Sequence, residues 1–218
     1  GYTFNGWYTA ATGGEKVTSY TGTTPITYYA HWTIDSHNLS VNPNGGVWNG
    51  SSSIQQFTQN YATTKTIANP TTNAYYTIKY NANGGTVATG NTLSYRPFIS
   101  WTKSGGGSFN DSIYTFDTSD GTLTANYNST GNAITTKTAS KSFTVTYNIN
   151  STGATSSNTT GTSSITYTMD GWYTAASEGT KRTENGGSYS PTTSETLYAQ
   201  WSGSLTLPTL TKTGYTCT

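Results

Sequence analysis

A two-part phrase recurs along this 218-residue chain and constrains its fold more than any other feature. The opening part reads Gly-Trp-Tyr-Thr-Ala-Ala and the closing part reads Tyr-Ala-x-Trp, with a degenerate copy between two clearer ones. The three copies occupy residues 6–11 with 29–32, 100–102 with 123–127, and 171–176 with 198–201. The opening Trp and the closing aromatic residue are 25, 26 and 29 positions apart (Trp7 to Trp32, Trp101 to Tyr127, Trp172 to Trp201). Such spacing is typical of internal repeats, so we interpret the chain as part of a repeat array.

Short alternations of apolar and polar residues predict strands with one buried face. The clearest alternations are residues 76–80 and 143–147, and the first is followed by an Asn-x-Asn-Gly-Gly turn sequence. In place of the double glycine, a turn at residues 150–153 is expected to follow the second. Aromatic residues make up 14% of the chain, which favours a folded β-rich protein although only 9% of residues are charged. Residues 54–57 are spaced for a single helical turn, and no longer helix is predicted.

Restarts of these patterns predict six segments. They are the C-terminal half of a truncated repeat at 1–34, a hairpin-type half module at 35–74, a degenerate full repeat at 75–128, a Thr-rich connector at 129–141, a full repeat at 142–203 and the start of the next repeat at 204–218. Because both ends fall inside a repeat, we expect the sequence to continue in a longer protein. Units of a repeat array contact mainly their neighbours, so neighbouring repeats are the expected partners.

Three phrases, taken together, resemble the Listeria–Bacteroides repeat, also called the internalin B-repeat. They are the Asn-x-Asn-Gly-Gly turn at residues 81–85, Gly-Tyr-Thr-Phe-x-Gly-Trp-Tyr-Thr at 1–9 and Thr-Leu-Tyr-Ala-x-Trp at 196–201. The resemblance implies a mainly β fold of tandem small β-grasp-like repeat modules with short or absent helix. It also implies a bacterial protein that is extracellular, at the cell surface or attached to the cell wall.

Few residues are placed to carry chemistry. A formal net charge of +1 provides no electrostatic surface for nucleic acid, and no apolar run reaches the ~18 residues of a membrane span. His31, His37 and the single cysteine, Cys217, lack the sequence context of a nucleophilic site. His31 occupies the slot of Gln200 and Asn126 in the other copies, which favours a solvated outward position. We therefore predict no enzymatic activity, no catalytic residue and no cofactor.

The carboxylates Asp117 and Asp120 are spaced loosely like those of a calcium loop. The segment lacks the third ligand and the distant Glu that such a loop needs. An Asp-Gly pair, here Asp120-Gly121, is common in turns. We therefore predict a turn between Phe116 and Leu123 and no metal site.

The aromatic residues leave one ambiguity open. Adjacent residues of a strand point to opposite faces, so a buried Trp in a Trp-Tyr pair turns its Tyr outward. The predicted core residues are Trp7, Trp32, Trp101, Trp172 and Trp201. The candidate binding face for glycan or host protein consists of Tyr8, Tyr28, Tyr173 and Tyr198. The alternative, which we favour, is that these tyrosines pair across strands and stabilise the sheet.

Three functions are compatible with these features. The one we favour is a non-catalytic structural spacer that presents an adhesive region away from a bacterial surface. The second is an adhesin array that binds glycan or protein through its exposed tyrosines. The third is an extracellular filament subunit that associates with itself, because unpaired strand edges in a chain with so few charges are templates for pairing.

Overall fold

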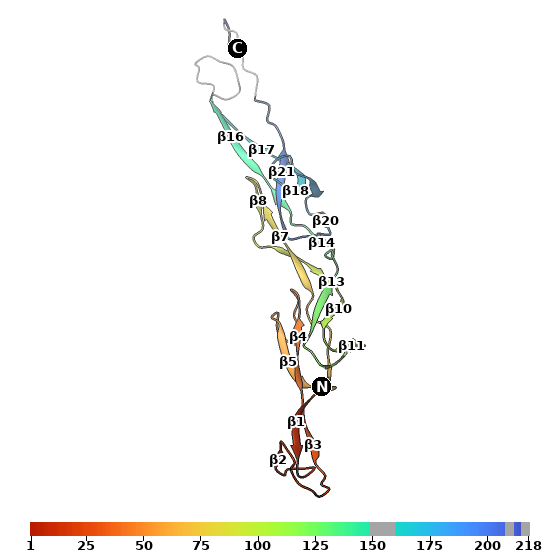
Figure 1. Ribbon diagram of the computed structural model, residues 1–218. Coiled ribbons are helices and arrows are strands. Elements are labelled where there is room, and N and C mark those ends of the chain that lie inside the picture. The colour runs from red at the N-terminus through yellow and green to blue at the C-terminus, as the bar shows by residue number, and fades with distance from the viewer. Residues whose placement is uncertain (149–159, 208–211, 215–218) are drawn as a thin grey trace. The chain divides into compact units, whose positions relative to one another are not determined.

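The computed structural model describes residues 1–148, 160–207 and 212–214, and every regular element in this part of the chain is a β-strand (Figure 1). The predicted mainly β fold is therefore confirmed, whereas its β-grasp detail stays a prediction. The helical turn predicted at residues 54–57 is wrong, because Gln55–Asn60 forms strand β5. Residues of β5 alternate between half-buried and exposed, and Phe57 packs against a core. The turn predicted at 150–153 and Cys217 lie outside the described residues.

Residue contacts divide the chain into two compact units that alternate along the sequence. Unit 1 consists of residues 1–74 and 97–128, and unit 2 consists of residues 75–96 and 129–218. The predicted segment 75–128 therefore contributes its first part to unit 2 and its second part to unit 1. Neither unit is one contiguous stretch of chain. The six sequence segments, as units of repetition, stay a prediction.

Unit 1 contains three sheets. Its strands are β1 (Tyr2–Tyr8), β2 (Lys16–Val17), β3 (Tyr29–Ile34), β4 (Ser36–Asn42), β5 (Gln55–Asn60), β6 (Thr64–Thr66), β10 (Phe98–Gly105), β11 (Ser108–Asn110), β12 (Ile113–Thr115) and β13 (Gly121–Tyr127). The largest sheet has the order β10-β13-β4-β5, in which β13 and β4 are parallel and the outer pairs are antiparallel. The other sheets have the orders β2-β1-β3 and β11-β12-β6, and all their pairs are antiparallel.

The described residues of unit 2 form one large sheet and three strand pairs. Its strands, the first of which begins at the unit boundary, are β7 (Ala74–Asn81), β8 (Thr86–Val87), β9 (Thr92–Arg96), β14 (Ile134–Thr135), β15 (Ala139–Ser140), β16 (Ser142–Asn148), β17 (Thr160–Thr166), β18 (Thr168–Tyr173), β19 (Lys181–Thr183), β20 (Ser188–Tyr189) and β21 (Glu195–Ser202). The large sheet has the order β19-β18-β21-β7-β9, with β21 and β7 parallel. The pairs β14-β20, β15-β8 and β16-β17 are antiparallel.

The two large sheets share one arrangement. In each, the first strand of the sheet in sequence (β4 or β7) lies in the middle, beside the last strand (β13 or β21). Alternate residues of these strands are apolar, so pairing places them together on one face. Leu39 and Val41 on β4 and Leu123 and Ala125 on β13 are all fully buried. The central strand pair therefore holds the core of its sheet.

Each unit has its own apolar core. In unit 1 the buried residues are Leu39, Val41, Trp48, Ile67, Tyr114, Phe116 and Leu123, with a second cluster of Ala74, Ala125 and Tyr127. In unit 2 they are Ile78, Ala139, Trp172, Leu197 and Ala199. Trp172 is the largest fully buried side chain among the described residues. Because a buried Trp removes about 150–250 Å² from water, it dominates the smaller core.

The glycine of the Gly-Trp phrase forms a β-bulge. The strand register shifts at Gly6 in β1 and at Gly171 in β18, where φ is 128° and 139°. Glycine adopts such positive φ angles without steric cost. A Cβ atom at either position would also lie 2.5 Å from the Cε of a lysine, Lys16 or Lys181. Backbone geometry therefore explains why this phrase contains glycine.

Candidate functional site

The structure brings the same group of residues together in both units, where the first and last strands of the large sheet meet. We call this region the closing joint: it consists of β4, β13 and residues 42–46 in unit 1, and of β7, β21 and residues 81–85 in unit 2. Four register pairs join the parallel strands in each unit, from Leu39–Gly121 to Asn42–Thr124 and from Ile78–Glu195 to Asn81–Tyr198. Each closing joint therefore connects stretches of chain that are distant in sequence.

The Asn-x-Asn-Gly-Gly sequence forms a tight turn at the end of β4. Asn44 and Gly45 adopt positive φ angles of 48° and 92°, which Asn and Gly tolerate best. The Gly46 amide donates to the Pro43 carbonyl at 3.0 Å. The Asn44 amide donates to the Asn42 side-chain oxygen at 2.9 Å. Each residue of the motif thus has a specific role in the turn.

The turn of unit 1 is fastened to the last strand by two side chains. The Asn44 side-chain amide donates to the Ala125 carbonyl at 2.9 Å, and the Tyr127 hydroxyl donates to the Pro43 carbonyl at 2.8 Å. A Cβ atom on Gly46 would lie 2.0 Å from the Tyr127 hydroxyl oxygen. Glycine at this position therefore allows the closing aromatic residue to reach the turn.

The turn of unit 2 makes equivalent contacts with different residues. The Asn83 side-chain amide donates to the Ala199 carbonyl at 3.0 Å. The Trp201 indole N–H donates to the Ala82 carbonyl at 2.9 Å, in the place of the Tyr127 hydroxyl of unit 1. A Cβ atom on Gly85 would lie 2.5 Å from the Trp201 ring. The closing aromatic residue of the phrase is therefore a hydrogen-bond donor to the turn as well as an apolar group.

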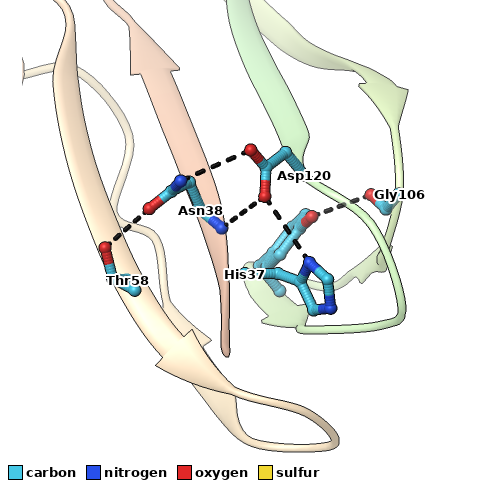
Figure 2. A network of polar contacts seen from close by, with 6 residues as sticks. His37, Asn38, Thr58, Gly106 and Asp120 are labelled. Carbon is cyan, nitrogen blue, oxygen red and sulfur yellow. Dashed lines mark hydrogen bonds and ion pairs between the residues drawn. The ribbon is translucent and has the colours of Figure 1, made fainter. Parts of the chain in front are cut away.

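The opposite end of the unit 1 closing joint is held by Asp120, which directly precedes β13 (Figure 2). One carboxylate oxygen accepts the Asn38 backbone amide at 2.8 Å, and the other accepts the Asn38 side-chain amide at 3.3 Å. The Nδ1 atom of His37 lies 3.6 Å from the first oxygen. The Thr58 hydroxyl donates to the Asn38 side-chain oxygen at 2.6 Å, which extends the network to β5. Asp120 therefore ties the beginning of β13 to the beginning of β4.

These contacts make the stability of unit 1 depend on pH. Hydrogen bonds from the Asn38 backbone and side chain, and to a lesser extent His37, lower the pKa of Asp120 below its usual 3.8. The native state therefore binds fewer protons than the unfolded state near this pH, so the stabilisation is full above the unfolded pKa and is lost as pH falls through the folded pKa. We expect the urea midpoint of unit 1 to fall between about pH 5 and pH 2.

The control for this prediction is a pair of substitutions of neighbouring carboxylates. Asp120→Asn should lower the midpoint at neutral pH and flatten its dependence on acid pH. Asp117→Asn changes an exposed carboxylate of the same loop without touching the Asn38 contacts. Equal pH profiles for wild type and Asp120→Asn would contradict the assigned role.

Two tyrosine hydroxyls near the closing joints act as hydrogen-bond donors. The buried Tyr114 hydroxyl donates to the Gly106 carbonyl at 2.7 Å, and burial raises the pKa of Tyr114. In unit 2 the Tyr189 hydroxyl donates to the Glu195 carboxylate. Burial and then this hydrogen bond raise the pKa of Tyr189 to about 12. Both hydroxyls are therefore protonated at neutral pH, and each holds its neighbouring segment through the hydrogen bond that it donates.

The bulged Gly-Trp phrase and its pairing partner across β1 and β3 lie in a stretch recognised by a known family model. Residues 1–31 match the Listeria-Bacteroides repeat domain. The match confirms the resemblance seen in the sequence, and the family is typically found in bacterial surface proteins. Comparisons with curated proteins and with solved structures gave no match.

Three of the predicted core tryptophans pack against a core. Trp172 is fully buried, and its indole N–H donates to the Lys137 carbonyl at 2.8 Å. Trp101 and Trp201 are half-buried and contact the cores of unit 1 and unit 2. The Trp101 indole nitrogen is buried without a hydrogen-bond partner among the described residues. The degenerate copy of the phrase thus keeps the tryptophan ring and lacks the hydrogen bond that Trp172 makes.

The other two predicted core tryptophans differ from the prediction. Trp7, inside the Listeria-Bacteroides repeat match, is 50% exposed, and Trp32, directly beyond it, is 58% exposed. The reason is the order β2-β1-β3, in which β3 is an edge strand without the parallel neighbour that β13 and β21 have. Tyr28 is half-buried, and its ring centroid lies 6.0 Å from that of Tyr20 in an edge-to-face arrangement. The aromatic surface in this region therefore includes tryptophans as well as tyrosines.

The other predicted binding-face tyrosines have neighbours on the adjacent strand. Tyr173 and Tyr198 are directly opposite each other in the register of β18 and β21, and both are half-buried. Tyr8 of the Listeria-Bacteroides repeat lies opposite Tyr29 and stacks on the His31 ring at 3.9 Å. These pairs have the geometry of cross-strand stabilisation. Glycan or partner binding by these tyrosines stays a prediction.

The residue directly before the closing Trp, His31 or Gln200, links its strand to the loop that follows the opening phrase. His31 Nε2 lies 2.9 Å from the Ala10 carbonyl, and the Gln200 side chain donates to the equivalent Ala175 carbonyl at 3.1 Å. The slot is therefore occupied by hydrogen-bonding side chains rather than by freely solvated ones. The outward solvated position expected for His31 is corrected accordingly. A sequence comparison of the two loops could have suggested this role.

The described residues contain no group of three or more His, Cys, Asp or Glu side chains arranged to hold a metal ion. Asp117 and Asp120 lie in the segment that connects β12 with β13, on either side of a bend at residues 118 and 119. In the same part of the chain, no helix is long and apolar enough to cross a membrane. The arrangement of residues that recurs in both units is the closing joint. Its side chains hold one strand to another through hydrogen bonds.

Proposed function

We propose that the chain is a non-catalytic, load-bearing spacer of a bacterial cell-surface protein and holds an adhesive region away from the cell envelope. The Listeria-Bacteroides repeat match supports the surface setting. The observation that carries the mechanical part is the parallel pairing of the first and last strands in the large sheet of each unit.

Parallel pairing determines how tension loads the closing joint. The start of β4 and the end of β13 lie at opposite ends of the strand pair, because the two strands run in the same direction. Tension applied at these two points slides the strands past each other and loads the four register pairs together. Tension applied at the same end of both strands opens the pairs one after another. The first direction resists force better because all the hydrogen bonds must fail together.

Side-chain hydrogen bonds fasten both ends of the unit 1 closing joint. Asp120 holds the start of the strand pair through Asn38, and the Asn44 side chain holds its end through the Ala125 carbonyl. Unit 2 has the second type of fastening through Asn83 and Trp201. These contacts oppose the sliding that tension would cause. They support a role in which strands stay in register under load.

Single-molecule pulling in two directions tests this function on the full chain. Cysteines for attachment replace Ser36 and Ser129 in one variant, which loads β4 and β13 in the sliding direction. In the matched control they replace Ser36 and Thr118, which loads the same strands at one end. Both variants carry Cys217→Ser so that attachment is specific. We expect a clearly higher rupture force for the first variant at the same loading rate, since forced unfolding is governed by the barrier along the pulled direction.

The two variants share the same strand pair and differ only in the second attachment point. A difference in rupture force therefore reports direction and not stability. Equal forces in the two directions would contradict the load-bearing role of the closing joint. Equal urea midpoints for the two variants are required as a control for folding.

A further inference from the structure

The sequence contains five Asn-Gly pairs, and in such a pair the asparagine side chain can react with the backbone of the next residue. The glycine nitrogen attacks the side-chain carbon Cγ, and the missing Cβ of glycine leaves the approach unhindered. This reaction makes asparagine a thermolabile residue. The five pairs begin at Asn5, Asn44, Asn49, Asn83 and Asn185.

The two asparagines of the closing joints are held by backbone carbonyls. The Asn44 side-chain nitrogen donates to the Ala125 carbonyl at 2.9 Å. The Asn83 side-chain nitrogen donates to two carbonyls, those of Ala176 and Ala199, at 3.0 Å each. Each side chain must leave these partners before its Cγ can approach the nitrogen of the next residue. The hydrogen bonds that fasten the closing joint therefore also slow this reaction.

Two further asparagines are held by partners on a strand. The Asn185 side-chain oxygen accepts the Ala139 backbone amide at 2.8 Å, and its nitrogen donates to the Ala139 carbonyl at 3.0 Å. Asn5 lies in β1, and its side-chain nitrogen donates to the Thr33 hydroxyl of β3 at 2.5 Å. Four of the five asparagines are therefore held through their side-chain amides.

Asn49 has the backbone conformation of the closing-joint asparagines and a more loosely held side chain. Its φ is 46°, against 48° at Asn44 and 47° at Asn83, and a glycine with positive φ follows each of them. The Asn49 side-chain nitrogen donates to the side-chain oxygen of Gln55 at 3.2 Å. Asn44 and Asn49 are both exposed. The partner of the side-chain amide, a side chain instead of a backbone carbonyl, therefore distinguishes Asn49.

The surroundings of Asn49 leave room for the reaction. Asn49 and Gly50 are the central residues of a hairpin turn in which Trp48 and Ser51 exchange backbone hydrogen bonds at 2.9 Å. Nothing lies within 4 Å of a Cβ atom built on Gly50, so a ring formed between the two central residues has space. Asn49 also lines an open hollow of about 260 Å³, which gives water access to it.

We propose that Asn49 is a site of spontaneous deamidation. The Gly50 nitrogen forms a bond to Cγ of Asn49, and the bond from Cγ to the side-chain nitrogen breaks. That nitrogen leaves as ammonia and takes the amide proton of Gly50. Water then opens the cyclic imide at either carbonyl. The products are aspartate and isoaspartate, in which the chain continues through Cγ, and both carry a new negative charge.

The modification changes a turn beside the core of unit 1. Trp48, directly before Asn49, is 4% exposed and donates its indole N–H to the Ala68 carbonyl at 2.7 Å. Isoaspartate adds a backbone atom between Trp48 and Ser51, whose mutual hydrogen bonds close the turn. The modified turn is therefore weakened next to a core residue. This inference goes beyond the load-bearing function and does not depend on it.

Ageing the full chain in mildly alkaline buffer, followed by digestion and mass spectrometry, tests the proposal. Deamidation gives a peptide the small mass gain of an acid over an amide. We expect this gain at Asn49 to be about tenfold faster than at the four held asparagines, which must first break a hydrogen bond of ordinary strength. In urea that unfolds the chain, the five rates should become similar. Equal rates in the folded chain, no gain at Asn49, or a difference that persists in urea overturns the proposal.

Gly50→Ala tests the route of the reaction in the same assay. The added Cβ hinders attack by the nitrogen of residue 50, and it has space in the folded turn. We expect the gain at Asn49 to fall to the rate of the held asparagines. Continued protection of Asn44 in the same digest shows that unit 1 remains folded. A Gly50→Ala chain that deamidates at Asn49 as fast as wild type, with Asn44 still protected, would show that the Gly50 nitrogen is not the nucleophile.

Discussion

Replacing Trp172 with alanine is expected to lower the free energy of unfolding of unit 2 by about 3–5 kcal/mol. The side chain is fully buried, and its removal leaves a cavity among Ile78, Leu197 and Ala199. The Lys137 carbonyl also loses the indole N–H that it accepts at 2.8 Å. Urea unfolding followed by circular dichroism measures the effect, with unit 1 providing an internal reference if the two units unfold separately.

Trp7→Ala is the matched control for this prediction. Trp7 occupies the same place in the Gly-Trp phrase but is half exposed, so its replacement should cost much less. The comparison separates the environment of the tryptophan from its position in the repeat. Similar losses for the two variants would mean that Trp7 is packed as closely in solution as Trp172.

Replacing Gly46 with alanine is expected to destabilise unit 1 by about 3 kcal/mol or more. The added Cβ would lie 2.0 Å from the Tyr127 hydroxyl oxygen and 2.7 Å from the Thr72 carbonyl oxygen. The ring must move, and the Pro43 carbonyl then loses the hydroxyl that it accepts at 2.8 Å. Urea unfolding with a probe for unit 1 measures the loss.

The control for Gly46 separates close contact from backbone strain. Gly50 has a φ of 76°, and nothing lies within 4 Å of an added Cβ. Gly50→Ala should therefore cost only the strain of a left-handed alanine, about 1–2 kcal/mol. Equal losses at the two positions would mean that the turn has room for a side chain and that the approach of Tyr127 is not required.

Local features of the fold were predictable from the sequence. The alternation at residues 76–80 predicts β7, and the following Asn-Gly-Gly predicts the turn with positive φ angles. Both depend on interactions between residues close in the chain. The alternation in residues 54–57 was ambiguous, because Ile54 and Phe57 fit a helical spacing while Gln55, Phe57 and Gln59 fit a strand. Pairing with β4 decided in favour of the strand.

The candidate site could be predicted only in part, because its contacts are non-local. The sequence predicts a turn at residues 81–85, but nothing in it indicates that the Asn83 side chain reaches the Ala199 carbonyl. The sequence also predicts a turn at Asp120, but its partner Asn38 is 82 residues away. Trp7 and Trp32 match the core tryptophans in sequence, yet they are 50% and 58% exposed, because β3 is the edge of its sheet. The sequence pattern therefore predicts whether a residue belongs to a strand, a turn or a core. Which distant residue it contacts depends on the complete topology.

The alternation of the two units along the chain has a consequence for synthesis. The first strand of unit 2 is synthesised before the last strand of unit 1, because residues 75–96 precede residues 97–128. Before residues 97–128 are synthesised, β4 and β7 both lack their parallel partners, and those partners have similar sequences. Non-local parallel pairing forms slowly and exposes strand edges meanwhile. When β13 is synthesised, two unpaired first strands of similar pattern, β4 and β7, are therefore present, and only pairing with β4 gives the native sheet.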